Sequence, residues 1–258
     1  MEELTKTHFS FFKSALLTGV IIAGLTALYF LGPYLYLGYP QLGETPAPLL
    51  GLIILLALIT GVLGNAMTDI ILFVLKKKNG LTGNYRKAAY AAFCGVIMAS
   101  MAVFIDIKTL GSGKEIMVTA LFSDHKQLEW YIPIVRIFGS IISFSTGAAG
   151  GVFAPSLSAG AGIGAVFAGW FHLSGPETNL LILCGMTGFL TSVTRSPFTS
   201  SILVLEMTNS HNVIFFILLT SLFSNLIASV MSRHSFYERL KDQYINEIHK
   251  IETQTEKG

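Results

Sequence analysis

Long apolar runs of unequal length are the feature of this sequence that most restricts its fold. Residues 15–36 and 49–75 are both at least as long as the roughly 20 residues that an α-helix needs to cross a bilayer. The chain is 52% hydrophobic and only 12% charged, and a soluble domain usually carries about twice that charged fraction. One core cannot hide so many apolar side chains. Lipid must therefore solvate much of the surface, which predicts an all-α integral membrane protein.

Glycine, proline and asparagine interrupt several of these runs. Gly32-Pro33 is expected to break the first helix, and the run at 49–75 is long enough to be either tilted or broken near residues 61–64. Three further runs are short or divided: 132–144, 180–193, and 198–231 with a split at 209–212. Irregular backbone is tolerated at membrane depth only where protein buries it or water lines it, and many transporters bind ions where broken helices end. The pattern is therefore typical of a transporter rather than of a uniform bundle.

Charged residues divide the chain into a membrane domain and a polar tail. Residues 1–232 contain the apolar runs, whereas residues 233–258 carry five Lys/Arg and five Asp/Glu. This second part is predicted to form the last helix and a short cytoplasmic tail, with no regulatory domain. Five basic residues without an acidic neighbour fall in one short loop, which the positive-inside rule places in the cytoplasm: Lys76, Lys77, Lys78, Arg86 and Lys87.

Several other functional classes lack the residues that they need. A net charge of +2 gives no basic face for nucleic acid, and the six histidines include no pair with metal-ligand spacing on one helix face. Cys94 and Cys184 lie in apolar runs and are interpreted as buried hydrophobes. The stretch GSGKE at 111–115 is not a phosphate-binding loop, since Lys108 and Glu115 replace the Gly and Ser/Thr of that motif. It is expected to be a turn, and we expect neither an enzyme nor a bound cofactor.

The stretch GAAGGVFAPS at residues 147–156 carries the strongest site signal. Its glycines let the chain bend and let a ligand approach the backbone. Pro155 suits the first turn of the helix that the apolar run 157–171 predicts. A helix N-terminus has free N–H groups and about half a positive charge, which together attract an anion. The same small residues would also suit close helix packing in a membrane, and the residues alone favour neither interpretation.

This stretch resembles the GxFxP motif of the CLC family of chloride channels and chloride/proton exchangers. Three other segments resemble blocks of that family and follow in the same order: 184–186 its AGM, 196–208 its RAPLTGIILVLEMT, and 235–237 the segment that opens its last helix. The resemblance covers nearly the whole chain. It implies the CLC inverted-repeat fold with broken and tilted helices, the second repeat largely complete and the first mostly absent.

The resemblance also implies an anion site. The residues that match it are Gly151, Val152, Phe153, Ala154 and Tyr237. By resemblance, the amides of Val152 and Phe153 help to coordinate a central chloride, and the Tyr237 hydroxyl donates a hydrogen bond to the same ion. Taken by itself, Tyr237 also fits an interfacial tyrosine at a membrane boundary.

Two acidic residues have interpretations of their own. Taken by itself, the acidic segment MEEL at residues 1–4 fits a helix N-terminus or a solvated chain end. It also resembles the segment that carries the exchangers' internal glutamate, and this resemblance implies that Glu3 transfers protons. Glu206 lies in an apolar run, where a carboxylate is a functional candidate by default. The resemblance gives Glu206 a structural part, and Arg195 is a candidate partner for its charge.

Two family motifs, GSGIP and GREGP, do not occur in the sequence. They supply the chloride-coordinating serine and the gating glutamate, so we expect a missing amino-terminal half to complete the pathway. The leading hypothesis is anion transport of the voltage-gated-chloride-channel type, by a chloride channel or a Cl−/H+ antiporter that is incomplete as given. The alternatives are a non-transporting fragment, half of a split transporter, a fluoride-selective member of the family, or an unrelated secondary transporter.

The expected partners follow from the same resemblance. They are chloride and, in an exchanger, protons, together with the lipid of a prokaryotic inner membrane. A homodimer is expected through the helices at 16–31, 198–207 and 213–231. The sequence itself gives this expectation only weak support, from small residues such as Gly19, Gly24 and Ser224 that permit close helix packing.

Overall fold

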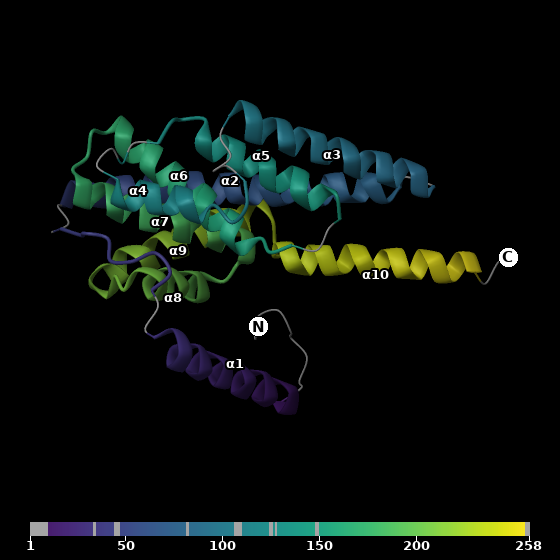
Figure 1. Ribbon diagram of the computed structural model, residues 1–258, viewed down its shortest axis with the longest axis horizontal. Helices are drawn as coiled ribbons and strands as arrows, with labels where there is room; N and C mark the ends of the chain where they lie inside the picture. Colours follow the sequence, from purple (N-terminus) through teal and green to yellow (C-terminus); the bar gives the residue numbers. More distant parts are fainter. Residues whose placement is uncertain are drawn as a thin grey trace.

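A computed structural model describes residues 10–32, 35–43, 47–80, 83–105, 110–123, 126, 128–147 and 150–255. The regular secondary structure of these residues is helical throughout (Figure 1). The helices run in chain order as α1 (Ser10–Leu31), α2 (Ala47–Asn79), α3 (Asn84–Phe104), α4 (Lys114–Phe122), α5 (Ile132–Ser145), α6 (Phe153–Trp170), α7 (Gly175–Thr194), α8 (Pro197–Thr208), the 3₁₀ turn η2 (His211–Val213), α9 (Ile214–Met231) and α10 (Phe236–Thr255). The prediction of an all-α protein is confirmed.

The helix α7 forms the centre of the fold. Every residue from Thr178 to Thr194 is buried, and α2, α6 and α9 pack around it. Glycines allow α6 to approach α7 at backbone distance. A Cβ added to Gly160 would lie 2.8 Å from the carbonyl carbon of Gly185, and one added to Gly164 would lie 2.5 Å from the Leu181 oxygen. No other residue fits at such distances, so these glycines set the spacing of the two helices.

The helix α2 is continuous. Of the two alternatives for this apolar run, a tilted helix or a break near residues 61–64, the break is wrong. The 33-residue helix passes through both glycines without interruption. Gly61 lies against α9, where an added Cβ would be 3.1 Å from the Ser224 carbonyl oxygen. Gly64 lies against α7, where an added Cβ would be 2.8 Å from the Ser192 hydroxyl oxygen. The two glycines therefore serve close helix packing and do not bend the chain.

Other expected interruptions are confirmed. The first helix ends at Leu31, and Gly32 follows with a positive φ of 74°. Asn209 caps α8 in the left-handed region, after which η2 turns the chain into α9. The stretch 111–115 begins as the expected turn, with Gly113 at φ 76°, and its last two residues, Lys114 and Glu115, already belong to α4.

Several helices are long and apolar enough to cross a membrane. Among the described residues four segments meet that condition: Ser14–Leu31, Pro48–Asn79, Asn84–Phe104 and His211–Asn246. The first of them, α1, lies apart from the other helices in Figure 1, and none of its 18-residue apolar window is buried. The last helix, α10, begins against the bundle and extends away from it toward the C-terminus. The fold is that of a membrane protein with peripheral apolar helices around a compact centre.

Candidate functional site

The N-terminus of α6 presents a group of backbone amides. Val152 is the N-cap residue, is only 1% exposed, and accepts the first bond from the Ser156 amide at 3.0 Å. Phe153 and Ala154 open the helix, and Pro155 has no N–H to donate. Within the described parts of the chain, no group accepts a hydrogen bond from the amides of Val152, Phe153 and Ala154. These three donors and the positive end of the helix dipole therefore point to an acceptor of another kind.

Tyr237 lies beside this helix start although it is 84 residues away in the sequence. Its ring centroid is 6.4 Å from that of Phe153, with the ring planes tilted by 39°. Its neighbour Phe236 is buried and packs edge-on against Phe144 at the end of α5, at 6.1 Å. The starts of α6 and α10 and the end of α5 thus meet in one aromatic cluster. The Tyr237 hydroxyl makes no hydrogen bond to any residue that the structure describes, which leaves its O–H available as a donor.

The start of α10 is fixed by a capping box. The Ser235 amide donates to the Glu238 carboxylate at 3.2 Å, and the Glu238 amide donates to the Ser235 hydroxyl at 3.2 Å. This reciprocal pair satisfies two amides of the first turn. The sequence signal was the Ser-x-x-Glu spacing, and its effect is to place Phe236 and Tyr237 in the first turn of the helix.

A polar cavity of about 170 Å³ lies beside the same loop. Gly150, Gly151 and Pro155 line one part of it, and α5 contributes Arg136 and Ser140. It also has apolar and small lining residues: Met98, Leu110, Gly111, Gly139, Ser143 and Phe144. The cavity is therefore bordered by the loop before the positive N-terminal end of α6 and by the guanidinium of Arg136. It is large enough for a small hydrated ion.

Arg136 is the residue of this region to which sequence reasoning gave no role. It is only 4% exposed, its Nε donates to the Ser158 hydroxyl on α6 at 2.9 Å, and its Nη1 donates to the Gly111 carbonyl at 3.1 Å. The signal available in the sequence was an arginine within an otherwise apolar run. Burying an ionisable side chain in a membrane segment costs free energy, so such residues usually have a function. Its hydrogen bonds join α5 to α6 and to the turn before α4.

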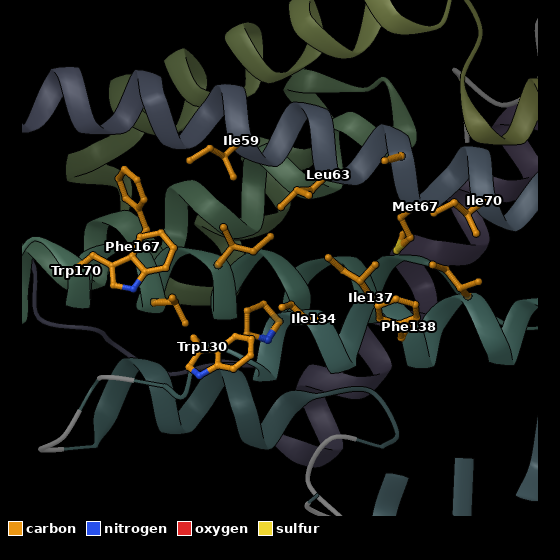
Figure 2. A pocket seen from close by; sticks show the side chains of 15 residues that line it. Ile59, Leu63, Met67, Ile70, Trp130, Ile134, Ile137, Phe138, Phe167 and Trp170 are labelled. Atoms are coloured by element: carbon orange, nitrogen blue, oxygen red, sulfur yellow. The ribbon is translucent and has the colours of Figure 1, made fainter. Parts of the chain in front are cut away.

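A second, larger cavity of about 380 Å³ differs in chemistry (Figure 2). Helix α2 contributes Ile59 and Leu63, α5 contributes Ile134 and Phe138, and α6 contributes Phe167; the remaining lining is likewise apolar or aromatic. No lining side chain is charged. An anion here would lose its hydration without replacement, at prohibitive cost. The polar loop beside α6 is therefore the better candidate for an ion site.

The structure brings the five expected anion-site residues close to one another. Val152, Phe153 and Ala154 share the start of α6, Gly151 precedes it exposed, and Tyr237 joins them from α10. Glu3 lies outside the described residues. The sequence could relate the two segments only through the family resemblance, because no local pattern connects residues 84 positions apart.

The candidate pairing of Arg195 with Glu206 is wrong. Arg195 caps α7 and turns its guanidinium toward α2 and α9, where it donates to Asn65 at 3.0 Å and to Ser229 at 2.9 Å. Glu206 instead lies 3.4 Å from the exposed ring of His211. The left-handed backbone at Arg195, with φ 59°, reverses the chain direction after α7 and sends the side chain away from α8.

Interrupted helices, a glycine-spaced centre and a helix start with unbonded amides define a helical membrane protein with a candidate ion site at a helix end. The comparison with family models is more specific: the voltage gated chloride channel model matches residues 1–229. The chain belongs to this family, as the sequence resemblance predicted.

Relatives of known kind match over much of the chain. The H(+)/Cl(-) exchange transporter ClcA of Citrobacter koseri is 27% identical over 237 residues, which cover 88% of this chain and 49% of the relative. ClcA of Cronobacter sakazakii is 28% identical over 254 residues, covering 93% of this chain and 53% of the relative. The chain thus spans about half the length of the curated relatives that it matches.

Solved structures show the same fold. A slow cyanobacterial Cl−/H+ antiporter superposes with a TM-score of 0.76 at 22% identity, covering 93% of this chain and 57% of its own. A CLC-type fluoride/proton antiporter superposes with a TM-score of 0.73 at 18% identity, and the match covers 92% of this chain and 58% of the antiporter chain. The predicted CLC fold is confirmed for the part of the protein that this chain contains.

Proposed function

We propose that this chain provides one side of an anion pathway in a chloride transporter of the CLC type. The observation that carries the proposal is the convergence of the unbonded amides at the start of α6 with the ring of Tyr237, 6.4 Å from Phe153. Amide dipoles and a hydroxyl offer partial charges. An ion bound by partial charges can leave again, whereas a full charge in direct contact would hold it too tightly for transport.

Chloride, exchanged for protons, is the substrate that the relatives favour. Those matched over 88% and 93% of the chain are named as H(+)/Cl(-) exchange transporters. In this proposal Gly151 lets the ion approach the backbone, Val152, Phe153 and Ala154 donate their amides, and Tyr237 donates its hydroxyl. Arg136 raises the local positive potential from inside the protein, where its Nε donates to Ser158 and its Nη1 donates to Gly111.

The described residues supply donors from one side only. An anion crossing hydrocarbon needs its lost hydration replaced on all sides, and a segment carrying GSGIP and GREGP would supply the opposite side. In the proposed assembly this chain works in a prokaryotic inner membrane together with such a segment, whether that segment belongs to the same or to another polypeptide.

A homodimer is part of the same proposal. The helices α1, α8 and α9 expose large apolar side chains, among them Leu25 at 63%, Phe198 at 61% and Phe215 at 80%. Lipid or a second copy must cover these surfaces. The predicted dimer segments 16–31, 198–207 and 213–231 include all three of these helices, which supports the pairing through them.

Uptake of radioactive chloride into liposomes tests the function. We expect saturable uptake when the chain is reconstituted with a polypeptide that carries GSGIP and GREGP, and uptake without this partner at the level of empty liposomes. Fluoride uptake measured in parallel distinguishes a fluoride-selective member. Absence of anion uptake and of halide binding by calorimetry in the complete assembly would contradict the proposal and favour a non-transporting fragment.

A further inference from the structure

A polar cluster joins the first turns of α10 to the middle of α2. Its members, here called the anchor cluster, are Asn65, Asp69, Arg195, Ser232 and Arg239. Arg239 forms an ion pair with Asp69, and Asn65 donates to the other Asp69 oxygen at 2.9 Å. We propose that the anchor cluster is a positioning device that holds Tyr237 over Phe153, so that Asp69 and Arg239 act on the anion site through Tyr237. Its effect on anion binding rests on the proposed function.

The helical geometry of α10 explains how the cluster acts at a distance from the site. Tyr237 and Arg239 are two residues apart, which places their side chains about 200° apart around the helix axis. One contacts Phe153 and the other contacts Asp69. Contacts on nearly opposite sides of a helix fix its rotation, so a change at Asp69 is passed to the ring of Tyr237.

A second contact fixes the position of α10 along its axis. One turn beyond Arg239, the Gln243 side-chain amide donates to the Leu72 carbonyl at 3.1 Å. Asp69 and Leu72 are three residues apart on α2, and their partners Arg239 and Gln243 are four residues apart on α10. Residues at these spacings lie on one face of a helix, so the two helices run side by side here. The start of α10 is thus held at two successive turns of α2.

Arg195 fixes the connection between α9 and α10. Its guanidinium donates to the carbonyl oxygens of Ala228 and Ser232, the latter at 2.9 Å, and to Asn65 at 3.0 Å. Ser232 follows the last residue of α9 and also lies 3.4 Å from Arg239 through its hydroxyl. One guanidinium therefore joins the end of α7, the end of α9 and the middle of α2, and it leaves the short linker to α10 little freedom.

The chemistry of the cluster favours positioning over simple stabilisation. Asp69 and Arg239 have side chains that are 44% and 30% exposed, and ion pairs of such exposure add little to stability. A carboxylate in a segment long and apolar enough to cross a membrane is costly. In this proposal the charged and hydrogen-bonded groups select one rotation of α10 against α2, which an apolar contact does not specify as sharply.

Two measurements test the proposal on the full chain in lipid nanodiscs, with its complementary segment where one is identified. The first is ¹⁹F NMR after 3-fluorotyrosine labelling, with the Tyr237 signal among the nine tyrosines assigned by its loss in Tyr237→Phe. The second is chloride affinity by calorimetry. In Asp69→Asn we expect the Tyr237 signal to shift or broaden and chloride affinity to fall about three- to tenfold. The charge-exchanged variant Asp69→Arg with Arg239→Asp should recover both.

Two controls separate positioning from charge and from folding. Asp242→Asn removes the same charge from the exposed side of α10 and should leave the Tyr237 signal and the affinity unchanged. In the Tyr237→Phe background, Asp69→Asn should cause no further loss of affinity, because the two changes act through one group.

The outcomes distinguish this inference from the proposed function. An unchanged Tyr237 signal in Asp69→Asn overturns the positioning role, as does an equal loss of affinity with and without the Tyr237 hydroxyl. If the wild-type assembly binds no halide, the proposed function fails, and the NMR comparison still decides whether the anchor cluster positions Tyr237.

Discussion

The Lys78 ammonium group donates a hydrogen bond of 2.6 Å to the carbonyl oxygen of Thr146. Lys78 lies in the last turn of α2, and Thr146 caps α5 just before the loop that leads to α6. A positive charge near exposed carbonyls at a helix C-terminus is favourable. This contact therefore joins the cytoplasmic lysines predicted from the sequence to the loop that carries the candidate anion site.

Replacing Lys78 by glutamine should loosen that loop. The loss of one charge-assisted hydrogen bond at a partly exposed position is worth about 1 kcal/mol, so amide hydrogen exchange at residues 150–156 should become about fivefold faster. Mass spectrometry of the exchanged protein measures this. Lys76→Gln, which removes the same charge from an exposed neighbour on α2, serves as the control. Equal exchange in the two variants would mean that the Thr146 contact does not hold the loop.

Replacing Tyr237 by phenylalanine should weaken anion binding without loss of folding. The ring contact with Phe153 is kept, and only one hydroxyl donor is removed, which is worth about 0.5–1.5 kcal/mol or more when the acceptor is charged. Chloride affinity should therefore fall modestly while the melting temperature stays within error. Tyr244→Phe, on the exposed part of α10, is the matched control. Identical affinities and identical proton/chloride stoichiometry in all three proteins would refute the assignment of Tyr237.

Replacing Gly160 by alanine should disrupt the centre of the fold. The added methyl group would lie 2.8 Å from the Gly185 carbonyl carbon, and backbone on both sides cannot move away. Overpacking of a core typically costs about 1–3 kcal/mol, and this position should lie at the upper end. Thermal unfolding followed by size-exclusion chromatography measures the loss. Gly95→Ala, where an added Cβ meets nothing within 4 Å, should not lower the melting temperature, because alanine is the better helix former at this position inside α3.

The capping box at the start of α7 predicts a dependence of stability on acid. The Ser174 hydroxyl donates to the Glu177 carboxylate at 2.7 Å and the Ser174 amide donates at 2.9 Å, and these bonds lower the pKa of Glu177. A carboxyl whose pKa is lower in the folded state stabilises the fold above its unfolded pKa. This contribution is lost as pH falls through the folded pKa.

The corresponding measurement compares wild type with Glu177→Gln. The wild type should melt at a slightly higher temperature at neutral pH, and the difference should shrink as pH falls below the unfolded pKa of a glutamate, about 4.3, toward the lower folded pKa. The effect is small because Glu177 is only partly buried, so solvent screens its charge. A difference that stays constant down to pH 3 would show that the carboxylate charge is not the cause.

Breaks that depend on local conformation could be predicted from the sequence. Gly32 and Asn209 adopt left-handed backbone that most residues avoid, so their residue types alone marked the ends of α1 and α8. Pro155 in the first turn of α6 is a similar local signal. The resemblance added the relation between this turn and Tyr237, which no local rule contains.

Features that depend on a distant partner could not be predicted in the same way. Gly61 and Gly64 looked like a break because a glycine pair also bends helices, and only the nearness of Ser224 and Ser192 shows that they serve packing. Arg195 was assigned a candidate partner eleven residues away, whereas Asn65, 130 residues distant, accepts its hydrogen bond. The sequence alone does not show which of many polar residues will pair with a given charged side chain.

The burial of α7 has a consequence for how the protein enters a membrane. Asn179, Thr187, Thr191 and Ser192 all lie within its buried stretch, and α7 is not among the described helices apolar enough to cross a bilayer alone. A helix of this kind gains little from lipid and most from its neighbours. Because α2 and α6 are synthesised before α7 and α9 after it, the nascent chain offers α7 a half-built groove that α9 later closes. We therefore expect the membrane insertion of α7 to be coupled to its packing against these neighbours.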